Sequence, residues 1–460
     1  MRGFPSIASS ETYRVRRWDV LMLGSALPGL IAAVRLGQRG LRVLVLEERA
    51  AEGDEFAREP FLLVDAETGG LLSGCLRAMG IALIDQRRFV SEEVALQVCD
   101  TEHRVDLGRT SHTADEWASW GLASRDDARR FAAALDEAAE AERAALLEAP
   151  ALLSATRRAR EALAPARKQG PERGWPRALA DAPRALRSVL DAPLRALSNL
   201  GASAPSPEAR ARLIGGLLRG GVTMSGGDGY LRGLLRRRIA ALYGEFRALD
   251  CAFRLVSVQN QPGIAVGGAK EIWTGRALLV NAPAAAIAAA VDEPLPAALE
   301  APPIRWRRHT VHYRGPREQI PPSMADRVIW RDDSAEETVA LRVFRGRGRA
   351  GFDLLASVVV PIDDPPAERR AESRIESALR DLLPFSEGAL ERRPLPQLRW
   401  DTDALLADPA GPTWPAEPEL RVSARPAVYG LDRASVAGLG SEGEVWLGWR
   451  AGDSIAAELS

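Results

Sequence analysis

Three small residues and one acid near the N-terminus have the types and spacing of a site for phosphate and ribose. Gly24, Ala26 and Gly29, with Ser25 between the first two, form a small-residue turn, and Glu47 follows farther along the chain. Such a turn lets an anion reach the free N–H groups and the positive dipole end of a helix. The acid then accepts a hydrogen bond from a ribose hydroxyl. This combination indicates dinucleotide binding.

The neighbouring sequence supplies the elements that must position these residues. Val20–Leu23 is an apolar run typical of a buried strand, and helical spacing then continues to Gly40. A second strand, Arg42–Leu46, ends at the acid. Ala26 replaces the middle glycine of G-x-G-x-x-G, and its methyl group narrows the pyrophosphate groove. A plain βαβ unit of another α/β protein stays open as the alternative.

The composition excludes several function classes. The 460 residues suffice for two or three domains, and 61 Lys and Arg balance 62 Asp and Glu, so no global charge attracts nucleic acid. Cys75, Cys99 and Cys251 form no C-x-x-C pair, which favours a reducing compartment and argues against a redox disulfide or a zinc site. We expect His309 and His312, near a strand, to be packed or solvated imidazoles rather than metal ligands.

A long helical insert interrupts the α/β pattern. Residues 111–219 are rich in Ala, Leu, Arg and Glu, and prolines divide them into short helices. The basic part, Arg157–Arg195, could rest on anionic lipid or could be a solvated helical face, and the second interpretation is favoured. No run is long enough to cross a membrane, so we expect a cytoplasmic protein with, at most, peripheral membrane contact. Residues 1–17 are expected to be a frayed extension.

Strands and helices alternate after the insert. A Gly-rich turn opens a helix near residue 231, and Phe253–Val258 pairs with Gly263–Val266 as a hairpin. The apolar strand Ala277–Val280 ends in Asn-Ala-Pro. The expected strands of a second, antiparallel sheet are Thr310–Tyr313, Arg327–Trp330, Thr338–Phe344 and Leu354–Val360. We expect an amphipathic helix over Ala367–Leu383 and a final strand over Glu444–Gly448.

These motifs together resemble the phytoene desaturase branch of the FAD-dependent amine-oxidase superfamily. The N-terminal DVLMLGSALPGLIAAVRLGQRGLRVLVLE matches the family's first motif, and SGGDGYLRGLL, YGEF and GGAKEIWTGRALLVNAP match its middle. The resemblance implies an α/β fold with three parts. They are a Rossmann-type (glutathione-reductase-like) FAD-binding domain (18–110, 220–300 and 440–460), the helical insert (111–219) and an antiparallel-sheet substrate domain (301–439).

The resemblance also implies the cofactor contacts. FAD would bind with its adenine end at the Gly24–Gly29 turn and its ribose on Glu47, and the backbone near Ala252 would contact the adenine. The family's last motif is a strand, a glycine loop and a helix whose N-terminus holds the ribitol and pyrophosphate. Gly448, Trp449 and Gly452 are the expected counterparts here. Either the loop is deleted and the helix begins at Gly452, which we favour, or Gly452–Asp453 is the family's Gly-Asp and the helix is lost.

The function implied is hydride transfer from a lipophilic substrate to flavin. No catalytic residue can be assigned from the sequence, and we expect no metal and no nucleic-acid partner. The alternative is a non-catalytic relative with a degraded flavin site, as Rab GDP-dissociation inhibitors are in the same superfamily. Neither the substrate, nor the electron acceptor, nor the oligomeric state follows from the sequence.

Overall fold

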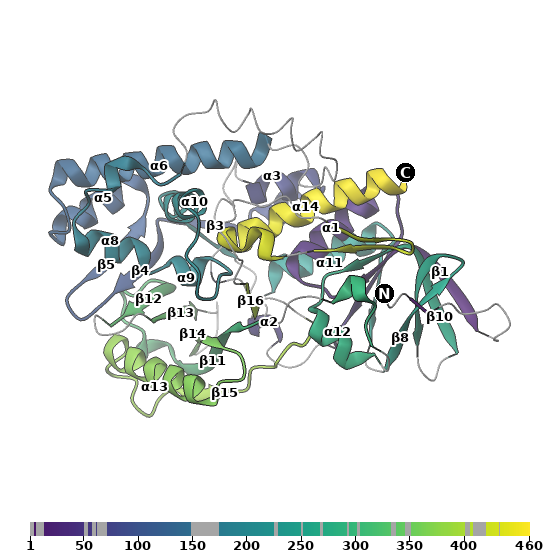
Figure 1. Ribbon diagram of the computed structural model, residues 1–460. Helices are drawn as coiled ribbons and strands as arrows, with labels where there is room; N and C mark the ends of the chain where they lie inside the picture. The colour runs from purple at the N-terminus through teal and green to yellow at the C-terminus, as the bar shows by residue number, and fades with distance from the viewer. Residues whose placement is uncertain are drawn as a thin grey trace.

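Two large sheets organise the computed structural model, one in each half of the molecule (Figure 1). The structure describes residues 4–5, 13–49, 54–57, 61, 71–148, 174–224, 229–249, 252–266, 270–291, 294–300, 304–332, 337–345, 351–400, 405–407, 420–431 and 433–460.

The first sheet is built around β1 (Arg14–Leu23), with β2 (Val43–Glu47) on one side and β10 (Glu271–Val280) on the other. All three run parallel, and Val20 lies beside Val43 and Ala277. Val20–Leu23, Val43–Leu46 and Ala277–Leu279 are buried on both faces, which explains the apolar sequence of these segments. The remaining strands of this sheet are β7 (Glu245–Ala248), β8 (Phe253–Val258), β9 (Gln261–Val266), β17 (Arg421–Ala424) and β18 (Ala427–Gly430).

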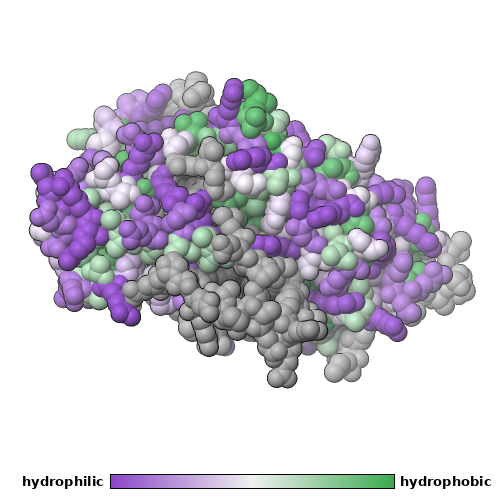
Figure 2. Space-filling view, turned by 90° about the horizontal axis from the view of Figure 1, so that it is seen from above, coloured by the Kyte–Doolittle hydropathy of each residue, from purple (hydrophilic) through white to green (hydrophobic). Residues whose placement is uncertain are grey.

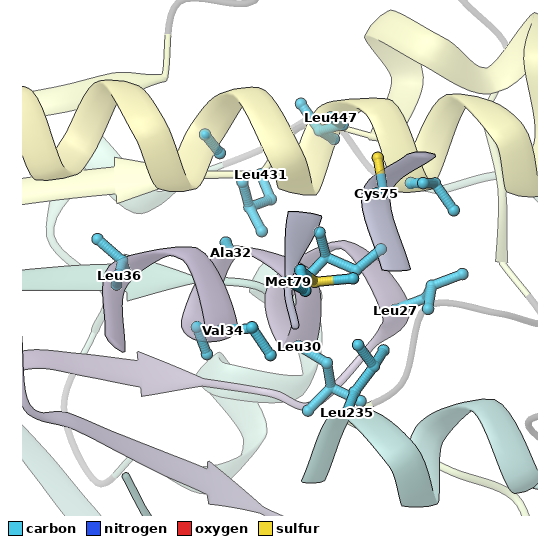
Figure 3. Packing of buried hydrophobic residues seen from close by; sticks show 14 of the residues in the cluster. Leu27, Leu30, Ala32, Val34, Leu36, Cys75, Met79, Leu235, Leu431 and Leu447 are labelled. Atoms are coloured by element: carbon cyan, nitrogen blue, oxygen red, sulfur yellow. The ribbon is translucent and has the colours of Figure 1, made fainter. Parts of the chain in front are cut away.

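Helix α1 (Leu27–Gln38) is enclosed by other helices in this half. It lies against α14 (Gly440–Leu459), while α11 (Tyr230–Ala241) packs on another of its sides. Figure 3 shows leucines of α1, α11 and α14 meeting Met79 and Cys75 in one apolar cluster. Further helices of this half are α3 (Leu71–Ala78), α4 (Leu83–Gln86) and α12 (Ala284–Ala290), while the short α2 (Asp54–Ala57) packs Phe56 against the second sheet.

The second sheet has the order β15-β11-β14-β13-β12-β4-β5. Helix α13 (Pro365–Leu382) covers the face that carries Val311, Leu341 and Ala356 (Figure 1). The strands are β4 (Val94–Cys99), β5 (Arg104–Gly108), β11 (Trp306–Pro316), β12 (Arg327–Arg331), β13 (Thr338–Phe344), β14 (Gly351–Pro361) and β15 (Glu391–Arg393), and β16 (Leu405–Leu406) pairs with β11.

The predicted helical insert is present and packs on the β4–β5 hairpin of the second sheet. Its longest helix, α6, lies against α5 and α10. The helices are α5 (Thr110–Ser119), α6 (Arg125–Glu148), α8 (Arg184–Asp191), α9 (Leu194–Leu197) and α10 (Pro207–Leu217). A short ribbon of β3 (Phe89–Glu92) and β6 (Gly221–Met224) joins the insert to the first half.

Four predictions about the chain's organisation need correction. The expected strand Glu444–Gly448 is wrong, because these residues lie inside helix α14. Arg14–Arg17 are not frayed but pair with β10. The β4–β5 hairpin belongs to the second sheet rather than to the FAD-type domain, and β17 and β18 belong to the first sheet rather than to the substrate domain. The expected strand at residues 61–64 lies outside the described residues except for Phe61.

The basic segment of the insert does not present an apolar face where it is described. Leu186, Val189 and Leu190 of α8 are buried in the insert's core, while Arg184 and Arg187 point to solvent. The face seen in Figure 2 is mostly hydrophilic, with small separate hydrophobic areas. Among the described helices, none is both long and apolar enough to span a bilayer. Peripheral membrane contact therefore stays a prediction.

Small residues let α14 approach α1 closely. Gly448 and Gly452 lie one turn apart on one face of α14, and a Cβ on Gly448 would lie 2.3 Å from the Pro28 carbonyl oxygen. A Cβ on Gly452 would lie 2.4 Å from Cβ of Arg35. Taken by itself, the segment EVWLG resembles a strand. Gly448 at its end and Gly452 after it are instead the small residues of a helix–helix interface.

We predict that Gly448→Ala destabilises the protein by about 1–3 kcal/mol, because the new methyl group overpacks the α1–α14 interface. Gly74→Ala is the matched control, since Gly74 lies in helix α3 with open space around its Cβ position. That change should stabilise the helix by about 0.5–1 kcal/mol. Urea unfolding followed by circular dichroism measures both, and equal effects would contradict the close approach.

Candidate cofactor and substrate site

The Gly24–Gly29 turn is shaped by the end of strand β10. Gly24 has a φ of 95°, which favours glycine, and its N–H donates to the Leu46 carbonyl at 2.8 Å. A Cβ on Gly29 would lie 2.0 Å from the Asn281 side chain, which donates to the Ala26 carbonyl at 3.0 Å. Both glycines are therefore required by the contact with residues 281–282, and this contact exists without any ligand.

The N-terminus of α1 retains the backbone arrangement of an anion site. Ala26 is its N-cap and offers no side-chain acceptor, and no acid occupies the first turn. However, Ser25 and Ala26 are buried, and Arg232 of α11 donates to the Ser25 carbonyl at 2.7 Å. The turn is thus covered by other residues of the chain, and the guanidinium of Arg232 lies beside it.

Glu47 already has a partner of opposite charge. It lies at the end of β2 as predicted, and Nη1 of Arg236 is 2.6 Å from its Oε1 and 2.5 Å from its Oε2. The same guanidinium stacks over Phe246, 4.2 Å from the ring centroid. A ribose hydroxyl would compete with this ion pair for the carboxylate. Ala252 is exposed just before β8, and its proposed contact with adenine stays a prediction.

Two buried carboxylates, Glu442 and Glu444, lie near the N-terminus of α14, and in the family it is the N-terminus of such a helix that holds the ribitol and pyrophosphate. Glu442 pairs with Arg212 of α10 at 2.5 Å, and both side chains are almost completely buried. A Cβ on Gly440, the first residue of α14, would lie 1.9 Å from the Leu197 carbonyl oxygen. Acids at a helix N-terminus are favoured by its dipole, so this helix end is stabilised by the protein's own charges.

Glu444 extends the same network toward the second sheet. Asn199 donates to it at 2.7 Å, and Arg433 forms an ion pair with it. Arg308 of β11 lies close enough for Glu444 to affect its pKa. The network therefore joins the insert, the first half and the second sheet at one point.

The three C-terminal residues predicted to contact the cofactor instead pack against helix α1. Gly448 and Gly452 are helix-interior residues against α1, and Trp449 stacks on the Arg35 guanidinium, 3.7 Å from the ring centroid. Both interpretations of the C-terminus are wrong, because the helix begins at Gly440 and strand β18, not residues 444–448, precedes it. A flavin contact by Gly448, Trp449 or Gly452 stays a prediction, and the helix start that was expected to position these residues lies at Gly440 instead.

A cavity of about 760 Å³ lies between the two halves. It extends from Leu27 and Arg232, beside the N-terminus of α1, to the face of the second sheet that α13 leaves uncovered. Arginines are frequent in its lining, among them Arg232, Arg307, Arg308, Arg342, Arg392, Arg393 and Arg433. The resemblance implies a flavin ring that faces a substrate cavity under the antiparallel sheet and the helical insert; this cavity lies against that sheet, and many of its lining residues are cationic.

A buried histidine–aspartate pair lies on this sheet face, and the sequence interpretation missed it. Nε2 of His312 is 2.9 Å from Oδ1 of Asp353, and Arg314 also donates to that carboxylate. Burial acts to raise the pKa of Asp353, but the hydrogen bonds from His312 and Arg314 outweigh it and hold the pKa below its usual range. The available signal was the alternation of Arg308, His312 and Arg314, which becomes visible only if the predicted strand Thr310–Tyr313 is extended at both ends.

The described residues fit the FAD contacts implied by the resemblance only in part. The backbone of the turn and the start of α1 fit a phosphate. Glu47, Glu442 and Glu444 do not fit, since each is bound to an arginine or asparagine of this chain. Cys75 and Cys99 are unpaired and buried, and burial raises the pKa of each to about 12, which argues against a thiol role. No metal-binding cluster occurs among the described residues.

Comparison with solved structures identifies the fold. An oxidoreductase from Methanosarcina mazei aligns with 96% of this chain and 99% of its own, at a TM-score of 0.57 and 15% identity. A putrescine oxidase variant redesigned for cofactor binding aligns with 97% of this chain and 100% of its own (TM-score 0.56, 14% identity). The chain has the fold of the FAD-dependent amine oxidases. Cyclohexylamine oxidase from Brevibacterium oxydans agrees, covering 96% of this chain and 99% of its own (TM-score 0.52, 14% identity).

This amine oxidase fold confirms the predicted fold class. No protein-family model matches the chain, and no curated protein matches its sequence. The fold is therefore shown by structure alone, at identities too low to transfer an activity.

We predict that Arg212→Leu destabilises the protein by about 3–5 kcal/mol, because Glu442 would be left buried without a counter-charge. The double variant Arg212→Leu with Glu442→Leu should recover most of that loss, since it removes both charges. Urea unfolding of wild type, both single variants and the double variant gives the coupling. Additive losses would show that the pair does not interact as described.

The lowered pKa of Asp353 predicts a pH-dependent contribution to stability. A carboxyl whose folded pKa is below its unfolded value of about 4 stabilises the fold above that value, and the contribution disappears as the pH falls through the folded pKa. Asp353→Asn should cost about 2–3 kcal/mol at neutral pH. The difference from wild type should shrink below about pH 4. Urea unfolding between neutral and acid pH measures it, and a gap that widens in acid would refute the assignment.

Proposed function

We propose that this chain is an FAD-dependent oxidoreductase that reacts with its substrate in the cavity between the two halves. The observation that supports this most is the continuity of the cavity from the α1 N-terminus to the uncovered sheet face. A cofactor whose phosphates lie at the turn could direct its reactive end toward the sheet. Structures sharing the fold carry the names oxidoreductase, putrescine oxidase and cyclohexylamine oxidase.

The proposal gives this chain's residues limited roles. The start of α1 and Arg232 would hold phosphate, and FAD would supply the hydride acceptor. A lipophilic substrate, as the phytoene desaturase branch implies, is the weaker choice, because arginines and His312 line the cavity. Transfer of an apolar molecule onto such groups would desolvate charges without compensation.

A non-catalytic binding protein is the second candidate, and a separate observation supports it. The carboxylate of Glu47, the implied ribose contact, is bound by a side chain of this chain, and so are Glu442 and Glu444 near the N-terminus of α14. A protein that has replaced flavin contacts by internal ion pairs would be stable without flavin.

The purified protein's visible spectrum and its thermal stability with added FAD separate the two candidates. An FAD-dependent oxidoreductase should be yellow as purified, or its thermal stability should rise as FAD is added. A ligand that binds only the folded state stabilises it by about 2.7 kcal/mol at a concentration of 100 times its Kd. A colourless protein with no gain would leave only the binding-protein candidate.

Arg236→Ala offers a sharper test of the Glu47 contact. If ribose competes with Arg236, removing the guanidinium should tighten FAD binding about tenfold, and Glu47→Ala should weaken it by a similar factor. Arg237→Ala, one residue along α11 and with its guanidinium over the Tyr230 ring, is the control and should change neither. Fluorescence titration with FAD measures the affinities, and identical values for all variants would place the ribose elsewhere.

A further inference from the structure

Strand β11 presents polar side chains to the cavity at alternate positions. Arg308, Thr310 and His312 share one face of the sheet and line the cavity. The register places Ser357 of β14 beside Thr310, and Arg342 of β13 in the row of His312. The floor of the cavity therefore carries cations and hydroxyls, with Leu355 and Ala340 in the same rows.

Arg308 is a half-buried arginine whose guanidinium is held mainly by backbone groups. Its guanidinium donates to the carbonyls of Arg195, at 3.0 Å, and of Ser198. No carboxylate of the described residues lies within ion-pair distance of it, and the nearby Glu444 is already bound to Arg433. Burial and Arg433 lower the pKa of Arg308 to about 10, so it remains charged at neutral pH.

A buried guanidinium without a counter-charge is costly, and carbonyl acceptors satisfy its hydrogen bonds without neutralising it. Its planar fork matches carboxylate and phosphate groups. Arg342, which lies over the Phe344 ring at 4.6 Å, adds positive charge at the other end of the floor. Asp363, Glu368 and Glu444 also line the cavity, but Glu368 and Glu444 pair with Arg307 and Arg433, so Arg308 and Arg342 remain as the cations available to an anion.

His312 adds a hydrogen-bond acceptor to this floor. Asp353 is held ionised by Arg314 and can only accept, so Nε2 of His312 carries a proton; in the neutral imidazole Nδ1 is then the acceptor. Nδ1 is buried and has no partner in the described part of the chain. Phe56 packs against the ring, with centroids 4.6 Å apart.

We propose that the cavity binds a small organic acid, with its carboxylate or phosphate on Arg308 and a hydroxyl or amino group donating to Nδ1 of His312. This inference deepens the proposed function by naming the substrate class, and it rests on that function only for the redox step. Binding itself needs no flavin.

The test is calorimetric titration of the full-length protein with four probes. 2-Hydroxyglutarate and glycerol 3-phosphate each carry an acid and a hydroxyl, glutaramide is a neutral analogue, and putrescine is a cation. We expect at least one of the two acids to bind saturably, and glutaramide and putrescine not to bind. Whichever acid binds more tightly distinguishes carboxylate from phosphate recognition. Failure of both acids, or equal binding of glutaramide, would overturn the proposal.

Variants then locate the ligand. Arg308→Gln should weaken binding of the preferred acid about 10- to 100-fold, whereas Arg370→Gln, an exposed arginine on α13 away from the cavity, should not. If Arg308→Gln does not fold, Arg342→Gln tests the same site and should also weaken binding. His312→Phe keeps a ring but removes Nδ1, so it should abolish any preference for 2-hydroxyglutarate over glutarate. Unchanged affinity in folded Arg308 and Arg342 variants would refute the site.

The outcome is separable from that of the flavin experiment. A colourless protein that binds an acid would remove the oxidoreductase proposal and keep this inference. A flavin-containing protein that binds neither acid would do the reverse.

Discussion

The buried ionic network at the start of α14 connects all parts of the molecule. Glu442 forms an ion pair with Arg212 of the insert. Glu444 accepts a hydrogen bond from Asn199 and forms an ion pair with Arg433. Arg308 of the second sheet lies close to Glu444. Because the charges are removed from water, each depends on its partner, and removing one leaves another unpaired. The relative placement of the first half, the insert and the sheet is tied to this one cluster.

The same network changes what the helix end can do. A helix N-terminus attracts anions, and in the implied family it would serve the cofactor. Here the helix's own glutamates lie in its first turn, and α9 approaches so closely that Gly440 has no room for a Cβ. The start of α14 therefore holds parts of this chain together through Glu442 and Glu444. The start of α1 has no side-chain cap, so its backbone N–H groups are not bound by a capping side chain.

The cavity's chemistry follows from which sheet face α13 covers. Apolar side chains such as Val311 and Ala356 face α13, so the alternating partners Arg308, Thr310 and His312 face the opposite side. Cations therefore line the cavity along this strand, which does not suit the lipophilic substrate expected from the sequence resemblance. This contrast favours a polar, acidic ligand over a lipophilic one.

The sequence by itself determined the local elements and the overall fold. The run Val20–Leu23, the turn glycines and the acid Glu47 predicted the first βαβ unit correctly, because strand burial and turn geometry depend on residues close in sequence. The alternating strands of the second sheet and helix α13 were likewise predictable from their period. Local periodicity carries this information without tertiary contacts.

Only the tertiary structure decided the state of the site. The partners of Glu47, Glu442 and His312 lie 189, 230 and 41 residues away in sequence, so no local pattern could reveal that the first two acids are neutralised and that the histidine is held by Asp353. The strand predicted at Glu444–Gly448 failed for the same reason, because its glycines serve a contact with α1 that only the folded chain contains. Long-range pairing of charges and close helix packing are properties of the assembled fold.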